Sequence, residues 1–105
     1  MYVKKEVLDR FFEELERNGK AVVTYTIPVK ENYGVFTLSD GEKVKTKTYG
    51  FTAVARAFKD AVEKRYGTLS HTESIGFRGD VYDNENVTLT LEAGWGVLWI
   101  EARRK

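Results

Sequence analysis

The stretch "WGVLWIEAR", residues 95–103, is apolar on both of the faces that a β-strand would present. Because side chains alternate along a strand, one face carries Trp95, Val97 and Trp99, and the other carries Gly96, Leu98 and Ile100. A strand of this kind is usually central in its sheet, or covered on its outer face by a partner subunit. The stretch therefore predicts a central strand and raises the question of what covers its Trp-bearing side.

Alternating apolar residues predict further strands before this stretch. The Asp-Gly pair in "SDGE", residues 39–42, accepts positive φ and therefore predicts a tight hairpin. Residues 76–86, "GFRGDVYDNEN", form the longest expected loop, and we expect Arg78–Asp80 to be a turn within it. The expected strands are 21–29, 33–39, 43–49, 68–77, 86–92 and 95–103.

Two segments, residues 3–17 and 52–66, have the apolar spacing of amphipathic helices. We expect the first helix to end in a left-handed cap at Gly19, and the second to begin with Thr52 as its N-cap and stop at Gly67. The resulting order, αβββαβββ, predicts an α+β fold. Its two helices would pack on one face of a mostly antiparallel, twisted sheet of about six strands.

The order of elements also suggests an internal repeat of about 50 residues. Aligning the helices matches Val7 with Val54 and Phe11 with Phe58, although any two amphipathic helices converge on such matches. We therefore expect residues 1–105 to form one α+β domain. Two interpretations stay open: the halves 1–50 and 51–105 arose by duplication, or the similarity of the helices arose without it.

The composition narrows the classes of function. The chain has 105 residues, a net charge of +1, no Cys and a single His. These values predict one domain without disulfides, Cys-based zinc sites or any metal site that needs several His ligands. The sequence also lacks a glycine-rich phosphate-binding motif. We therefore expect neither a metal nor a cofactor.

Residues 1–20 lack the continuous apolar run of a signal peptide or a membrane span. We therefore expect a soluble, cytoplasmic protein that does not bind membranes. Lys, Arg and Glu are abundant, whereas Gln and Cys are absent. This bias predicts thermostability, and it fits both a hyperthermophile protein and an idealised designed sequence.

Alternation also assigns residues to the two faces of the expected sheet. The face that the helices would bury carries Val23, Tyr25, Ile27, Phe36, Leu38, Val44, Val87, Leu89, Leu91, Leu98 and Ile100. The opposite face carries Thr24, Thr26, Thr37, Lys43, Lys45, Lys47, Thr88, Thr90, Val97, Trp99, Glu101 and Arg103. This second face combines hydroxyl groups, a row of lysines and a large aromatic ring.

The second face is the main candidate binding surface. Its candidate residues are Lys43, Lys45, Lys47, Trp95, Trp99 and Arg103. Exposed Trp side chains favour contact with a protein partner or with a second copy of the chain. Lysines that neutralise phosphates beside a stacking ring would instead favour single-stranded nucleic acid. A third interpretation needs no ligand, because lysines along an edge strand protect it from aggregation.

A second candidate site is "LSHTESIGF", residues 69–77. In a regular strand His71 and Glu73 lie side by side, and a carboxylate so placed can orient an imidazole as a general base. No nucleophile stands at a diagnostic spacing. The pair therefore predicts either an exposed strand edge or the lining of a pocket, to which Tyr25 would contribute.

These observations favour a small, non-catalytic binding module that associates with a protein partner or with itself through the Trp-bearing face. Nucleic-acid binding on the same face is the alternative hypothesis. A small-molecule or enzymatic pocket around His71 and Glu73 is the third.

Overall fold

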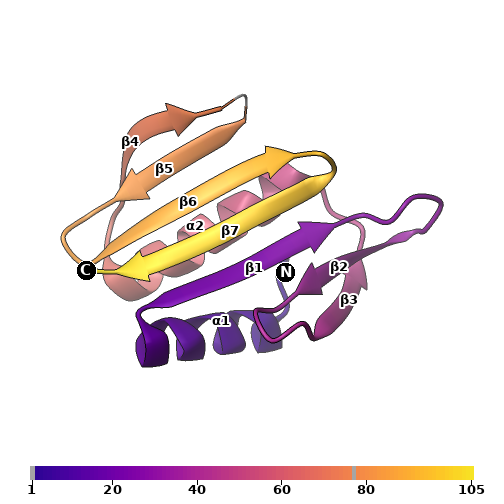
Figure 1. The fold of residues 1–105 in the computed structure, drawn as a ribbon, viewed down its shortest axis with the longest axis horizontal. Coiled ribbons are helices and arrows are strands. Elements are labelled where there is room, and N and C mark those ends of the chain that lie inside the picture. The colour runs from indigo at the N-terminus through magenta and orange to yellow at the C-terminus, as the bar shows by residue number, and fades with distance from the viewer. Residues whose placement is uncertain (1, 77) are drawn as a thin grey trace.

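The computed structural model describes residues 2–76 and 78–105, which form two helices and seven strands in the order αβββαββββ (Figure 1). The helices are α1 (Lys5–Asn18) and α2 (Phe51–Tyr66). The strands are β1 (Lys20–Thr26), β2 (Tyr33–Thr37), β3 (Lys43–Lys47), β4 (Ser70–Ile75), β5 (Gly79–Asp83), β6 (Val87–Gly94) and β7 (Val97–Arg104). The predicted α+β class and both predicted helices are confirmed.

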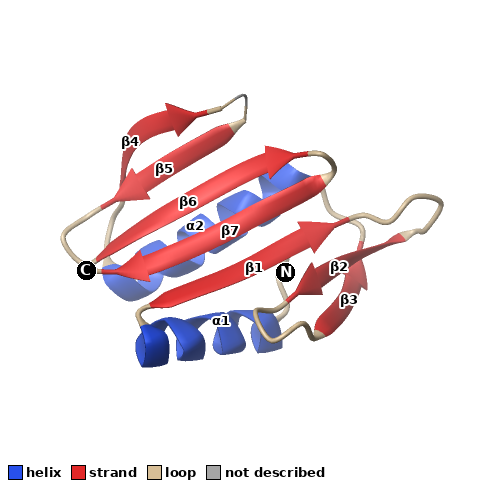
Figure 2. Cartoon of the chain, in the orientation of Figure 1, coloured by secondary structure: helices blue, strands red, loops and turns tan. Residues whose placement is uncertain are grey.

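The strands form one antiparallel sheet in the order β3-β2-β1-β7-β6-β5-β4 (Figure 2). β7 is the middle strand and pairs with β1 on one side and with β6 on the other. The prediction of a central strand is therefore confirmed for residues 97–103, whereas Trp95 and Gly96, predicted as its first residues, lie in the turn before it. β3 and β4 form the two edges of the sheet.

Both helices pack on one face of the sheet, and the apolar core lies between the two layers. The buried helical side chains are Val7, Phe11, Phe12 and Leu15 of α1 and Val54, Phe58 and Val62 of α2. The rings of Phe11 and Phe58 lie 5.2 Å apart, and the ring of Phe58 lies 6.2 Å from that of Phe36 in β2. One cluster of buried residues therefore joins both helices to the sheet.

Glycines end both helices as predicted. Gly19 has a φ of 75°, and its N–H donates to the Leu15 carbonyl at 2.9 Å, while the Gly67 N–H donates to the Glu63 carbonyl at 2.8 Å. The prediction of Thr52 as an N-cap is wrong, because α2 begins one residue earlier and Gly50 is the N-cap. Neither helix of the described chain is long and apolar enough to span a membrane.

The strand β5 lies within residues 76–86, which we predicted to be a loop. β5 pairs with β4 on one side and with β6 on the other, and this pairing outweighs the poor strand propensity of Gly and Asp. The turn predicted at Arg78–Asp80 is wrong in part, because Gly79 and Asp80 begin the strand. A Cβ at Gly79 would lie 2.5 Å from the Ile75 side chain, so this strand position requires glycine.

The predicted faces of the sheet agree with the burial of most residues. On the helix side Val23, Tyr25, Phe36, Leu38, Val87, Leu89, Leu91, Leu98 and Ile100 are buried, and Val44 packs against them. Ile27 is the exception: it lies beyond the end of β1 and is 37% exposed. On the other side all twelve predicted residues are half-buried or exposed. Phe77, predicted as the end of a strand, lies outside the described residues.

The two predicted half-repeats follow different paths through the sheet. β1 follows α1 beside the middle strand and the chain then moves outward to β3, whereas β4 follows α2 at an edge and the chain moves inward to β7. The duplication of residues 1–50 and 51–105 stays a prediction.

Candidate functional site

The sheet face turned away from the helices is uncovered, and we call it the open face. The strand register places on it Lys20, Val22, Thr24, Thr26, Tyr33, Val35, Thr37, Lys43, Lys45, Lys47, Ser70, Glu73, Ile75, Val81, Asp83, Thr88, Thr90, Glu92, Val97, Trp99, Glu101 and Arg103. All the residues that we predicted for binding lie on this face except Trp95.

Trp99 lies near the centre of the open face. It is 43% exposed on β7, opposite Thr24 of β1 and Glu92 of β6. Its Nε1 donates to Glu101 Oε1 at 3.3 Å, and Arg103 Nε donates to Glu101 Oε2 at 2.8 Å. Burial alone would raise the pKa of Glu101, but the hydrogen bonds from Arg103 and Trp99 outweigh it and hold that pKa below its usual value. Glu101 and Arg103 therefore form an ion pair beside the Trp99 ring.

The three predicted lysines lie on the edge strand β3, three strands away from Trp99. At about 4.8 Å per strand this separation is roughly 14 Å. Lys43 Nζ donates to the Thr37 hydroxyl at 3.3 Å, and Lys45 Nζ lies 4.6 Å from the centre of the Tyr33 ring. The lysines and Trp99 thus share one face but do not form one compact cluster.

The charges of the open face are divided between its two halves. On β1, β2 and β3 the charged side chains of this face are all lysines: Lys20, Lys43, Lys45 and Lys47. On β4, β5 and β6 they are all carboxylates: Glu73, Asp83 and Glu92. Asp83 also accepts a hydrogen bond from Lys105 Nζ at 2.7 Å. The central strand β7 therefore separates a positive half from a negative half.

Trp95 lies at the tip of the β6–β7 hairpin. Gly94 pairs with Val97, so Trp95 and Gly96 form a two-residue loop, and their φ values of 55° and 76° are those of a type I′ turn. A bulky residue rarely adopts positive φ. The Trp95 side chain is 103% exposed, so no packing compensates for this backbone strain. A binding role for Trp95 stays a prediction, at a place separate from the open face.

The predicted pair of His71 and Glu73 does not form. β4 has a bulge between them: His71 pairs with Tyr82, whereas Glu73 pairs with Val81. The extra residue shifts the alternation by one, so His71 lies on the helix side and Glu73 lies on the open face. The side-by-side prediction is therefore wrong. The actual neighbour of His71 is Asp80, whose Oδ1 lies 2.8 Å from His71 Nε2.

Tyr25, the third residue of the predicted pocket, belongs to the core. Its side chain is fully buried, and its hydroxyl donates to the Tyr49 carbonyl and accepts from the Tyr49 N–H, both at 2.9 Å. A Cβ at Gly34 would lie 2.4 Å from this hydroxyl, so the ring occupies space that only glycine leaves. The structure therefore does not bring Tyr25, His71 and Glu73 together.

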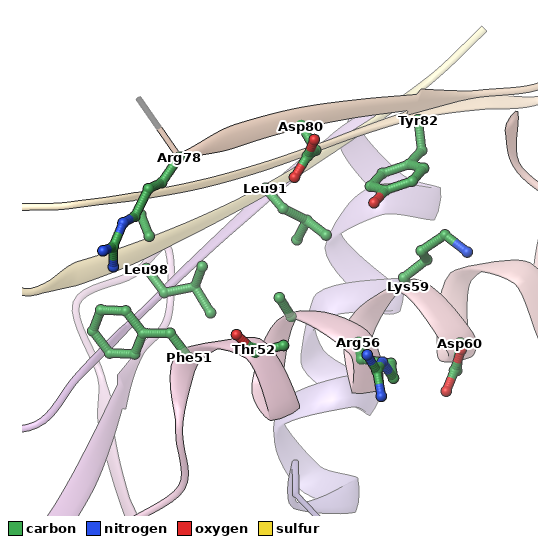
Figure 3. Close-up of a pocket in the computed structure, with 12 residues that line it drawn as sticks. Phe51, Thr52, Arg56, Lys59, Asp60, Arg78, Asp80, Tyr82, Leu91 and Leu98 are labelled. Carbon is green, nitrogen blue, oxygen red and sulfur yellow. The ribbon is translucent and has the colours of Figure 1, made fainter. Parts of the chain in front are cut away.

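A groove of about 740 Å³ lies on the helix side of the sheet, between α2 and the strands β5 and β6 (Figure 3). It is lined by Phe51, Thr52, Ala55, Arg56, Lys59, Asp60, Arg78, Asp80, Tyr82, Leu91, Ala93 and Leu98. Asp80, the partner of His71, belongs to its wall. We did not predict this groove from the sequence. The only local signal is the spacing of Ala55, Arg56 and Lys59, which places a small residue and two cations along one side of α2.

Known proteins give no guide to which surface is functional. Comparisons of the chain with protein-family models, curated proteins and solved structures found no match. Among the described residues, no group of three or more His, Asp and Glu side chains is arranged to hold a metal ion. The open face and the groove are therefore the two surfaces that a functional proposal has to explain.

Proposed function

We propose that this protein is a small, non-catalytic interaction module that pairs with a second copy of itself through the open face. The division of charge on this face carries the proposal. Lysines lie on β1 and β3, carboxylates lie on β4, β5 and β6, and Trp99 lies between them on β7. A surface divided in this way is complementary to a copy of itself.

A two-fold axis parallel to β7 produces this complementarity. Rotation about the axis exchanges the two sides of the sheet, so that β3 of one copy lies over β4 of the other. Lys43 and Lys45 of one copy then approach the carboxylate strands of the partner, and the same contact occurs a second time. Trp99 lies close to the axis, where it meets the same residue of the partner subunit.

The open face is large enough for such an interface. Seven strands spaced by about 4.8 Å, with about six residues each at roughly 3.3 Å per residue, give a flat area on the order of 600 Å². Side-chain relief makes the accessible area larger than this projection. A standard stable interface buries about 800 Å² on each partner. Two twisted sheets can also pack face to face with their strands about 30° apart.

Size-exclusion chromatography with light scattering tests the proposal on the full chain. We expect a dimer mass at tens of micromolar protein and dissociation on dilution. Added salt should weaken the dimer, because it screens ion pairs between the copies. A chain that stays monomeric at about 1 mM protein would exclude the proposal.

Charge reversal tests the predicted pairing of the two halves. One variant carries Lys43→Glu and Lys45→Glu, and the other carries Glu73→Lys and Glu92→Lys. In each variant most charges of the open face have the same sign. Two copies of one variant should therefore repel each other and stay monomeric. An equimolar mixture should form a heterodimer, because the two faces are then opposite in sign.

A matched control separates this effect from a change in net charge. Lys4, the N-cap of α1, and Lys64 of α2 are exposed and lie away from the open face. Lys4→Glu combined with Lys64→Glu changes the net charge as much as the first variant does, yet should leave the dimer intact. If the Lys43→Glu, Lys45→Glu variant dimerises as the unmodified chain does, the copies pair through another surface.

Nucleic-acid binding on the same face has weaker support. The predicted lysines share the open face with Trp99, but Glu92 and Glu101 flank the Trp99 ring and would repel phosphates. Titration with a short single-stranded oligonucleotide at low salt distinguishes the two proposals. Saturable binding that the charge-reversed lysine variant loses, by a chain that is monomeric, would favour nucleic acid over self-association.

A further inference from the structure

The groove exists because the sheet is wider than the helices that cover it. α2 packs mainly under β6 and β7, whereas β4 and β5 extend beyond it (Figure 1). The underside of β5 therefore faces α2 across an open space. Figure 3 shows Leu91 and Leu98 pointing from the sheet into this space, above Thr52 of α2.

The groove has a partly apolar lining and a size that suit a small molecule. Leu91 and Leu98 are buried, and with Ala55 and Ala93 they give the groove an apolar lining. The ring of Phe51 lies at one end and the ring of Tyr82 at the other (Figure 3). The volume of about 740 Å³ falls within the range of about 300–1,000 Å³ that small-molecule sites occupy.

The groove is lined by charged side chains of both signs. Arg56 and Lys59 of α2 and Arg78 before β5 are the cations, and Asp60 and Asp80 are the carboxylates. Glu63, which lies outside the groove, forms an ion pair with Lys59 and balances the third cation. The preference for an anionic ligand therefore depends on the exposed guanidinium of Arg56. The first turn of α2 contains no acidic residue, so the positive end of the helix dipole adds to this preference.

Some of these charges already have partners within the protein. Asp80 Oδ1 lies 2.8 Å from His71 Nε2. Lys59 Nζ forms an ion pair with Glu63 at 3.2 Å and lies 5.1 Å from the centre of the Tyr82 ring. Arg56 is exposed and forms no hydrogen bond or ion pair with any residue in the described ranges 2–76 and 78–105. An anion can therefore reach the Arg56 guanidinium without displacing an internal partner.

We propose that the groove binds a small organic anion with a flat apolar body. Its carboxylate or similar group accepts hydrogen bonds from the Arg56 guanidinium, whose planar donors match a carboxylate. Its apolar body lies against Leu91 and Leu98. The groove and the open face are on opposite sides of the sheet, so this binding does not depend on the dimer.

Naphthoate and its neutral amide form a matched pair of probes for a heteronuclear NMR titration of the full chain. We expect naphthoate to shift the amide signals of residues 51–60, 78–82 and 91–98, with a dissociation constant on the order of 1 mM. The amide should bind about ten-fold more weakly, because it lacks the charge. Equal binding of both probes, or shifts confined to the open face, would overturn the proposal.

Variants of α2 identify the groove as the site. Arg56→Gln should weaken naphthoate binding about five-fold or more, whereas Lys64→Gln removes the same charge outside the groove and should have no effect. Ala55→Phe fills the groove without changing its charge and should abolish binding. Because a filled groove can also disturb folding, Arg56→Gln is the deciding variant: unchanged affinity in this variant would contradict the proposed role of Arg56.

Discussion

Asn84 joins the end of α2 to the start of β6 through one side chain. Its Nδ2 lies 3.2 Å from each of the carbonyl oxygens of Tyr66, Gly67 and Thr68, where α2 ends. Its Oδ1 accepts the N–H of Asn86 at 2.7 Å and the N–H of Val87 at 3.0 Å, where β6 begins. The sequence shows only an Asn in an expected loop, because both groups of partners are set by the tertiary structure.

We predict that Asn84→Ala lowers the free energy of unfolding by about 2 kcal/mol, because it removes hydrogen bonds to five backbone groups, of which those to Tyr66 and Val87 are partly buried. Urea denaturation of the variant and of the unmodified chain measures the difference. Asn32→Ala is the control, since Asn32 is exposed and should change stability by less than about 0.5 kcal/mol. Equal losses in the two variants would contradict the role assigned to Asn84.

Glu63 ties the end of α2 to the start of β4. The backbone hydrogen bond from the Leu69 N–H, at 2.8 Å, is the main reason that the pKa of Glu63 lies below its usual value of 4.5. Burial raises this pKa, and the hydrogen bond and charge of Lys59 lower it. A lowered pKa in the folded state means that the ionised carboxylate stabilises the fold above about pH 4.5, and that this stabilisation is lost as the pH falls through the folded-state pKa.

We therefore predict that Glu63→Gln lowers the free energy of unfolding by about 1 kcal/mol at neutral pH and by less at about pH 3. Urea denaturation at both pH values measures the two differences. A difference that grows as the pH falls would have the wrong sign for a lowered pKa and would contradict this account.

At the scale of elements, the β6–β7 hairpin contains a residue that its turn does not favour. Trp95 and Gly96 both have positive φ, and a type I′ turn favours Asn followed by Gly. We predict that Trp95→Asn raises the free energy of unfolding by about 1 kcal/mol, because Asn tolerates this conformation and the exposed Trp ring loses no packing. Thermal and urea denaturation test the change. A less stable variant would show that Trp95 makes contacts that its exposure conceals.

The helices and the strands β4 and β5 illustrate how far elements can be predicted from sequence. Both helices begin and end within two residues of their predicted bounds. The spacing of apolar residues and the terminal glycines that predict a helix are local features of the sequence. β5 was missed because its Gly and Asp residues favour a turn when considered alone. The bulge in β4 was missed because it is a property of the pairing between two strands, which separates His71 from Glu73.

At the scale of the whole molecule, a substitution of Trp99 should affect association of two copies much more than folding of one copy. In the proposed dimer it lies close to the two-fold axis, where buried aromatic side chains contribute most. We predict that Trp99→Thr weakens the dimer about 30-fold or more, while the free energy of unfolding of the monomer changes by no more than about 1 kcal/mol. Light scattering over a dilution series and urea denaturation at low protein concentration measure these two quantities.

Trp95→Asn is the matched control for this prediction. It also removes a Trp, but from the hairpin tip, and should leave the dimer as stable as that of the unmodified chain. If both substitutions weaken the dimer equally, the interface includes the tip of the hairpin and is not centred on the open face.

The sequence by itself determined the α+β class, both helices, the central position of residues 97–103 and most of the residues on each face of the sheet. These features depend on the alternation of apolar and polar residues in strands, on the spacing of apolar residues in helices, and on turn residues. All three are patterns within short stretches of chain. The tertiary structure alone decided the order of the strands, the bulge that separates His71 from Glu73, the groove under β5 and the division of charge across β7. Each of these depends on which distant segments pair, as when Lys20 of β1 lies opposite Arg103 of β7, and no short stretch of sequence contains that information.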